Sequence, residues 1–208
     1  MNTQLELEKA WAKARSFPGE LSLHEPSSLE PELSASIIIN LLKATYINHA
    51  ISRDPVGVAH DIRSGHVLPW IITRDHRPVA CAALIQQPDG SQELGRAVSI
   101  ENGSGAGKIA MLSAANVCHT NLVAEVRLAG EFEGVPSGLA TQSICHGVLG
   151  LVPHAVFAPF KHGNPERHEL FAFSSADSQL PPNGRFTAQA THTFSPRQST
   201  RRETSRRF

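Results

Sequence analysis

The sequence contains no long hydrophobic run. Hydrophobic residues make up 40% of its 208 residues and charged residues 18%, proportions that are ordinary for a globular domain. A helix that spans a bilayer needs about 20 consecutive apolar residues, and no segment approaches that length. Residues 1–9 are acidic and lack the apolar stretch of a secretory signal. These absences exclude a membrane-spanning protein and predict a cytoplasmic location.

Cysteine is scarce as well. Cys81, Cys118 and Cys145 are odd in number and lie in apolar segments. Secreted proteins usually hold cysteines in even numbers that pair as disulfides. The three thiols are therefore expected to be reduced and buried, which again favours the cytoplasm.

Net charge is also absent, because 19 basic and 19 acidic residues balance. The charges are unevenly distributed: residues 185–208 contain six arginines and one glutamate, which gives this segment +5 and leaves −5 for the rest. Serine, threonine and proline surround the arginines, so residues 176–208 are predicted to be a disordered basic tail. The tail could contact nucleic acid or an acidic partner, but a merely solvated tail is favoured. No other segment suggests a nucleic-acid partner.

Hydrophobic periodicity divides the rest of the chain into helices and strands. A long helix is predicted at 32–49, and a hairpin where residues 74–77 join strands 68–73 and 78–85. The other predicted helices are 4–15, 56–63, 109–115 and 137–149, and the other predicted strands are 19–24, 93–100, 122–129, 155–160 and 169–174. Ser137 is a suitable N-cap for the last helix and Gly150 a suitable stop.

A glycine-rich segment stands where a predicted strand gives way to a predicted helix. It reads Asn102-Gly103-Ser104-Gly105-Ala106-Gly107-Lys108. Glycine has no Cβ, so the backbone can take a positive φ and direct several N–H groups at one anion. The first turn of the helix adds unpaired N–H groups and a positive dipole end. A flexible surface turn is the alternative, but the flanking strand and helix favour a loop that binds phosphate.

Two common phosphate loops do not fit this segment. The NTPase loop has the pattern G-x-x-x-x-G-K-[ST], but Asn102 stands at its first glycine and Ile109 at its hydroxyl residue. The dinucleotide pattern G-x-G-x-x-G would need its last glycine at Lys108. Both patterns are therefore excluded.

The segment resembles the acyl-CoA loop of the GNAT-type N-acetyltransferases, whose pattern is [QR]-x-x-G-x-[GA]. Gly105 and Gly107 match the glycine positions, and Asn102 stands at the Gln/Arg position. The order of predicted elements over roughly residues 20–175 is also that of this family. The resemblance implies an α/β fold with a mixed, mostly antiparallel central sheet, splayed strands four and five, and flanking helices. Residues 19–175 would form this acyltransferase domain, and residues 1–18 an appended N-terminal helix.

The resemblance also implies how a cofactor would bind. Acetyl-CoA would be the co-substrate, and its pyrophosphate would lie on the loop formed by Asn102, Gly103, Ser104, Gly105, Ala106, Gly107 and Lys108. The pantetheine arm would lie between strands four and five, bonded to the backbone of Ala97, Val98 and Ile100. A backbone N–H there would also stabilise the oxyanion of a tetrahedral intermediate. Val98 and Ile100 would look the same in the sequence if they were ordinary core residues of a strand.

The acid that protonates the leaving thiolate is a tyrosine in much of this family, within a Tyr-x-x-x-Gly-Phe pattern on the fourth helix. His146 stands at that position. Histidine can donate a proton near neutral pH, and a polar helix residue is the alternative. Tyr46 is the only tyrosine in the chain and lies on a different helix.

The base that deprotonates the amine has three candidates, Glu93, Glu125 and His119. Glu93 is favoured because the family often carries a glutamate on strand four, although an exposed glutamate at a strand edge would look the same. Glu125 shares a strand face with Arg127, and a structural ion pair would explain both residues.

Histidine and cysteine also suggest a metal site. Two Cys-His pairs, Cys118-His119 and Cys145-His146, occur together with His154, His162 and His168. Zinc ligands are usually spaced as C-x₂₋₄-C or H-x₃₋₅-H, and neighbours on a helix point about 100° apart. We therefore expect no metal.

The polar loop 161–169 would lie on the acceptor side of the resembling family. Its charged and polar residues could bind the acceptor or be solvated; they are Lys161, His162, Arg167 and Glu169.

Together these features predict an N-acyltransferase that transfers acetyl from acetyl-CoA to a primary amine by direct attack. The acceptor would be a small-molecule amine or a peptide, and the protein a monomer or homodimer. A catalytically silent acyl-CoA sensor or partner-binding module of the same fold is the alternative. A metal-binding protein is a third class.

Overall fold

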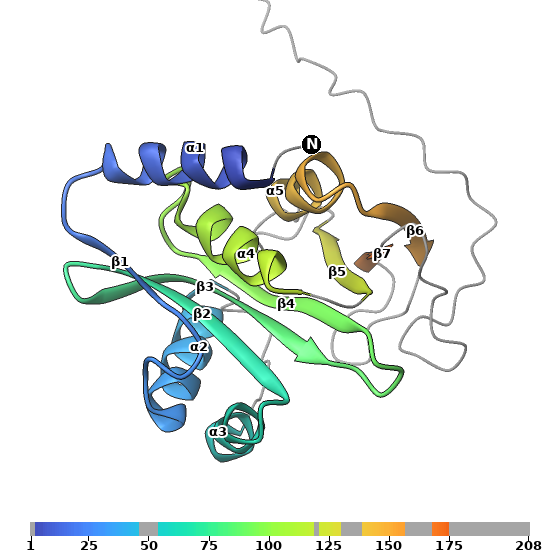
Figure 1. Cartoon of the computed structure of the whole chain (residues 1–208), viewed down its shortest axis with the longest axis horizontal. Coiled ribbons are helices and arrows are strands. Elements are labelled where there is room, and N and C mark those ends of the chain that lie inside the picture. Colours follow the sequence, from blue (N-terminus) through green and yellow to red (C-terminus); the bar gives the residue numbers. More distant parts are fainter. Residues whose placement is uncertain (1–2, 46–53, 119–120, 130–138, 157–167, 175–208) are drawn as a thin grey trace, which may run out of the picture.

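The structure is a computed structural model that describes residues 3–45, 54–118, 121–129, 139–156 and 168–174. Within these residues seven strands form one sheet in the order β1-β2-β3-β4-β5-β7-β6 (Figure 1). All neighbouring strands are antiparallel except β4 and β5, which are parallel. The strands are β1 (Leu21–His24), β2 (Val67–Arg74), β3 (Arg77–Gln86), β4 (Gln92–Ser99), β5 (Leu122–Ala129), β6 (Val152–Val156) and β7 (His168–Ser174). The mixed, mostly antiparallel sheet confirms the predicted fold class.

Helices cover both faces of the sheet. Figure 1 shows α1 (Thr3–Arg15), α4 (Ala106–Asn116) and α5 (Leu139–Gln142) on one face. The helices α2 (Pro31–Thr45) and α3 (Pro55–Arg63) lie on the other face. No helix in the described part of the chain is both long and apolar enough to cross a bilayer.

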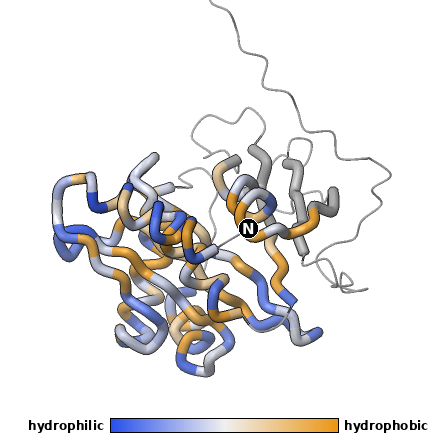
Figure 2. The backbone as a smooth tube through the Cα atoms, turned by 45° about the horizontal axis from the view of Figure 1, so that its top comes forward, coloured by the Kyte–Doolittle hydropathy of each residue, from blue (hydrophilic) through white to orange (hydrophobic). Residues whose placement is uncertain are grey.

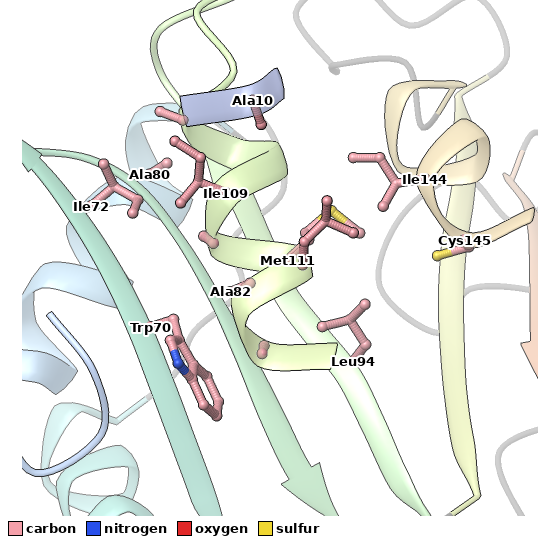
Figure 3. Close-up of a cluster of buried hydrophobic side chains, with 14 of the residues drawn as sticks. Ala10, Trp70, Ile72, Ala80, Ala82, Leu94, Ile109, Met111, Ile144 and Cys145 are labelled. Carbon is pink, nitrogen blue, oxygen red and sulfur yellow. The ribbon is translucent and has the colours of Figure 1, made fainter. Parts of the chain in front are cut away.

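The central strands are buried on both faces, and hydrophobic residues recur along them (Figure 2). Trp70 and Ile72 of β2 belong to a cluster that includes α4 residues, whereas Ile71 between them packs in a cluster with α2. Successive side chains of a strand point to opposite faces, so one strand supplies both clusters. Figure 3 shows Trp70 and Ile72 on the same side of the sheet as Ile109 of α4. This double burial explains the near-continuous apolar runs of β2 and β3.

The last predicted helix takes an unexpected form. Among its described residues, Leu139–Gln142 are α-helical and Ser143–Val148 continue as a π-helix. The N–H of Leu149 donates to the carbonyl of Ile144, five residues back, at 2.9 Å, which is the bond of a π-turn. Gly150 follows with a φ of 70° and confirms the predicted stop, whereas the predicted N-cap Ser137 lies outside the described residues.

The other elements agree with the prediction to within a few residues. The helix predicted at 32–49 is described as Pro31–Thr45, and the strand predicted at 155–160 as Val152–Val156. Residues 46–49 and 157–160, including Tyr46, lie outside the described residues. The predicted basic tail, 176–208, lies outside them as well.

Candidate active site

Strands β4 and β5 part soon after they begin. They pair only at Gln92↔Leu122 and Glu93↔Val123 in the described structure. Beyond that point β5 remains paired with β7 as far as Ala129↔His168. The predicted splay of strands four and five is therefore present, and it starts next to Glu93.

A bulge in β4 accompanies the parting. Cys81 lies opposite Val98 and Ala83 opposite Gly95, so one β3 residue faces two residues of β4. Arg96, one of these two, has a φ of 51°, and its carbonyl accepts a hydrogen bond from the Cys81 thiol at 3.3 Å. Bulges bend a strand and increase its twist. The bulge thus gives a physical reason for β4 to leave β5.

The register also decides which backbone groups of β4 face the parted side. The N–H of Ile100 donates to the carbonyl of Val79 on β3 at 2.9 Å, and Ser99 lies opposite Ala80. Successive residues of an antiparallel pair alternate between facing the partner and facing away. Ser99 therefore directs its N–H and carbonyl toward β5, whereas Val98 and Ile100 direct their N–H groups toward β3. The sequence had suggested the backbone of Ala97, Val98 and Ile100 for contact with the cofactor, and the register turns the N–H groups of Val98 and Ile100 away from β5.

The glycine-rich loop follows β4 directly and opens α4. Gly103 and Gly105 have φ of 76° and 91°, and Gly105 is the N-cap of α4. Ser104 is fully buried; its hydroxyl donates to the Glu101 carbonyl at 3.1 Å and accepts from the Ala106 N–H at 3.2 Å. Asn102 and Gly103 are exposed. The loop therefore has a fixed inner side and an open outer side.

Helix geometry determines what the loop presents to a ligand. The first intrahelical bond runs from the Ile109 N–H to the Gly105 carbonyl, so the N–H groups of Gly105, Gly107 and Lys108 precede the helical ladder. A Cβ on Gly107 would come within 3.1 Å of the Ser99 Cβ, which means that helix and strand approach closely here. Backbone N–H groups and the positive end of α4 thus lie at the end of β4, an arrangement that favours an anion.

Glu93 is the last residue of β4 that pairs with β5, and its side chain is buried. Its carboxylate accepts a hydrogen bond from the Gln87 side-chain amide at 2.7 Å. Glu125 lies on the β5 backbone opposite Ala172 of β7, beyond the point of parting. His119 lies outside the described residues. The structure thus places Glu93 at the vertex between the two strands.

His146 lies on the π-helix, and it is exposed although its neighbour Cys145 is buried. Its Nδ1 lies 3.1 Å from the carbonyl of Leu151; the carbonyl can only accept, so this bond requires Nδ1 to carry the proton. Nε2 is then the atom that can exchange a proton with a substrate. The Cys145-His146 pair points in two directions, as expected for neighbours on a helix.

Solved structures match this arrangement, whereas no family model and no curated protein matches the sequence. A protein from Salmonella typhimurium, assigned as an acetyltransferase and solved with its cofactor acetyl-CoA, gives a TM-score of 0.56 at 12% identity, over 78% of this chain and 98% of its own. Diaminobutyrate acetyltransferase from Paenibacillus lautus, solved with L-2,4-diaminobutyric acid and coenzyme A, gives 0.55 at 13% identity, over 79% and 100%. A protein from Desulfovibrio desulfuricans, assigned to the GNAT family of acetyltransferases, gives 0.52 at 11%, over 75% and 98%. The chain has the GNAT fold.

In this GNAT fold, the sequence-predicted residues lie at different points along β4 and on the helix beside α4. Glu93 marks the vertex, and the loop 102–108 follows the free end of β4. His146 lies on the same face of the sheet as α4, on the helix that packs its Ile144 into the α4 cluster. Figure 3 shows Ile144 and Met111 pointing toward one another across the space between the two helices.

Other predicted residues do not enter the described site. His162 and the loop residues Lys161 and Arg167 lie outside the described residues, and Glu169 is described only as part of the β7 backbone. Within the described part of the chain, no three histidine, cysteine or acidic residues are placed to hold a metal ion. The three cysteines form no disulfide; Cys81 and Cys145 are buried and Cys118 is partly exposed.

Sequence reasoning missed three residues of the candidate site. Arg96 at the bulge has no sequence signal except its neighbour Gly95. Ser99 could be assigned only from the β3–β4 register. Glu101 precedes the loop and makes two hydrogen bonds there. Its backbone carbonyl accepts from the Ser104 hydroxyl, and its carboxylate accepts from the Arg74 guanidinium at 2.9 Å. An acidic residue beside an anion loop was the available hint.

Proposed function

We propose that this protein is an acyl-CoA-dependent N-acyltransferase that transfers acetyl from acetyl-CoA to a primary amine. One observation supports the proposal: two parallel strands part, and the freed strand β4 leads into a glycine-rich helix start. An extended thioester would lie along the freed edge of β4, and its phosphates would lie at the helix start. Two proteins of the same fold were solved with acetyl-CoA or coenzyme A, which supports this choice of cofactor.

The backbone would hold the cofactor. The pyrophosphate would accept hydrogen bonds from N–H groups of the loop 102–108, where Gly103 and Gly105 have positive φ. The pantetheine amides would bond to the edge of β4 that faces β5. By register that edge includes Ser99.

The chemistry would be a direct attack. The amine nitrogen adds to the thioester carbonyl, the C–S bond breaks, and the proton lost by the amine goes to a base. Glu93 is the proposed base, acting directly or through a water, because it is the carboxylate at the vertex. A β4 N–H would stabilise the oxyanion. His146, as an imidazolium with Nδ1–H bonded to the Leu151 carbonyl, would give its Nε2 proton to the thiolate and become neutral.

The cofactor assignment is tested by calorimetric titration of coenzyme A into matched glycine variants. Gly103 and Gly90 both have positive φ, 76° and 82°, and a Cβ on either would meet nothing within 4 Å. Gly103→Val and Gly90→Val should therefore cost similar stability, but only Gly103→Val should weaken coenzyme A binding, by about tenfold or more. Equal affinities in the two variants would remove the loop from the cofactor site.

Turnover is tested by following free thiol release from acetyl-CoA across a panel of amines. Acetyl transfer to at least one primary amine is the expected result. A protein that binds coenzyme A tightly and turns over none of the panel would instead be the acyl-CoA sensor. That second candidate has a specific basis, because Asn102 replaces the Gln/Arg of the loop pattern and the His146 ring is already bonded to Leu151.

A further inference from the structure

Helix α1 lies across the start of α4 and its loop. Ala10 and Ala14 of α1 are buried in the same cluster as α4 residues, and Figure 3 shows Ala10 directly beside the first turns of α4. A Cβ on Gly105 would come within 3.0 Å of the Ala10 carbonyl. The inner side of the proposed phosphate loop is therefore covered by α1.

The C-terminal end of α1 is fixed to the loop by Arg74. The guanidinium of Arg74 donates to both carboxylate oxygens of Glu101 at 2.9–3.1 Å and to the Ala14 carbonyl at 3.1 Å. It also donates to three carbonyls of the segment that leaves α1, those of Phe17, Pro18 and Gly19. Arg74 thereby fixes the position of the end of α1 relative to Glu101, the residue that precedes the loop.

The N-terminal half of α1 brings a carboxylate to the loop's own lysine. Glu6 Oε2 lies 2.6 Å from Lys108 Nζ, and Glu6 Oε1 lies 2.8 Å from Lys9 Nζ. Lys108, then Lys9, lowers the pKa of Glu6 to about 2, so the carboxylate is charged at neutral pH. Lys108 is the third residue of α4, where its ammonium group reinforces the positive end of the helix.

We propose that Glu6 sets the affinity of the site for phosphate-bearing ligands: it occupies Lys108 in the unliganded protein and is displaced from it when coenzyme A binds. This inference rests on the proposed function of the loop. A lysine ammonium is a compact charge whose three donors are shared among nearby anions. A phosphate that approaches the loop competes with the Glu6 carboxylate for this ammonium.

The proposal predicts opposite effects for the two partners of the ion pair. Glu6→Gln removes the competing charge, so coenzyme A should bind about three- to tenfold more tightly. Lys108→Gln removes the shared cation, so binding should weaken by about tenfold. In the Lys108→Gln background, Glu6→Gln should change affinity by less than about twofold, because the ammonium that both anions use is gone.

The experiment is calorimetric titration of the full chain with coenzyme A and with pantetheine. Pantetheine has no phosphate, so its affinity should be unchanged in Glu6→Gln, which also shows that the site is still folded. Glu32→Gln is the matched control, because Glu32 pairs with Arg63 on α2 and α3, away from the loop; it should leave coenzyme A binding unchanged.

A second variant keeps the proposal testable if Glu6→Gln loosens α1. Lys9→Gln removes the other cation that pairs with Glu6, so Glu6 then pairs with Lys108 alone and competes more strongly with phosphate for its ammonium. Lys9 is largely exposed, so the fold should persist, and coenzyme A should bind a few-fold more weakly unless Glu6 is also neutralised.

The outcomes separate the two proposals. A wild-type protein that binds no coenzyme A contradicts the proposed function itself. A wild-type protein that binds coenzyme A, with Glu6→Gln equal to it or weaker while pantetheine binding is unchanged, contradicts the role of Glu6. Glu6 would then position the lysine for phosphate instead of competing with phosphate.

Discussion

Two non-glycine residues with positive φ form the turn between β2 and β3. Asp75 and His76 have φ of 48° and 63° and form the two-residue turn between Arg74 and Arg77, as required for a type I′ hairpin. Asp75 is needed there, because its carboxylate accepts from the Glu20 N–H at 2.8 Å. His76 is exposed and has no such bond in the described structure.

His76→Gly should therefore stabilise the protein. The left-handed conformation costs an L-residue about 1–2 kcal/mol, and the greater freedom of glycine in the unfolded chain offsets about 0.4–1 kcal/mol of that gain. A net increase of about 0.5–1 kcal/mol in the free energy of unfolding is expected from urea denaturation. His76→Ala keeps the unfavourable φ and should show no such gain; a stabilised alanine variant would contradict the explanation.

The thiols should differ strongly in reactivity. Burial raises the pKa of the Cys81 and Cys145 thiols to about 12, so both stay protonated and shielded near pH 8, whereas Cys118 is partly exposed. A chromogenic disulfide reagent should titrate one thiol rapidly in the native protein and three in denaturant. Cys118→Ser should abolish the rapid phase. Rapid titration of two or more thiols in the native protein would show that the core opens easily.

Glu93 is the residue on which the proposed chemistry depends most. Glu93→Gln keeps the size and one hydrogen-bonding oxygen but cannot accept the ammonium proton, so turnover should fall by about 10²–10⁴-fold. The loss should be greatest at low pH, where little free amine is present. Single-turnover rates across pH measure this, with coenzyme A affinity as the control that should not change. A wild-type profile would leave Glu125, His119 or a bound water as the base.

At the scale of elements, the connection between α1 and the sheet depends on one buried guanidinium. The Arg74 side chain is 9% exposed and its partner Glu101 24% exposed, and Arg74 also satisfies carbonyls at the end of α1. A charge in such a position is costly if it loses its counter-ion. Through Arg74, Glu101 thus links the glycine-rich loop to α1 and β2.

Glu101→Gln should destabilise the protein by about 1–3 kcal/mol, the range for a lost charged hydrogen bond. Glu32→Gln is again the matched control. The side chains of Glu32 and Arg63 are 64% and 56% exposed, so breaking their pair should cost less than about 1 kcal/mol. Urea denaturation measures both, and equal losses would show that burial of Arg74 does not matter.

At the scale of the whole molecule, charge is divided between two regions. Residues 185–208 carry +5 and the rest −5, and the sequence of this segment offers few hydrophobic side chains to a core. Deleting residues 185–208 should therefore leave the melting temperature and coenzyme A affinity nearly unchanged, measured by calorimetry. A large fall in melting temperature would show that the segment packs on the domain.

The sequence by itself determined the elements and their order. The apolar repeats of α2, β2 and β3 indicate which faces are buried, and the glycines Gly103 and Gly105 indicate where the backbone turns with positive φ. These signals are local, because each depends on neighbours along the chain. They were enough to suggest the GNAT fold, which the structure confirms, and to select the loop.

Only the tertiary structure decided how strands and helices meet. The bulge at Arg96 and the register that turns Ser99 toward β5 depend on pairing with β3, and a strand's sequence does not encode its partner's position. The contacts of Glu6 with Lys108 and of Arg74 with Glu101 join residues 102 and 27 positions apart. Such charges look like ordinary surface residues in the sequence. Their role comes from the packing of α1 onto α4, which brings distant charges together.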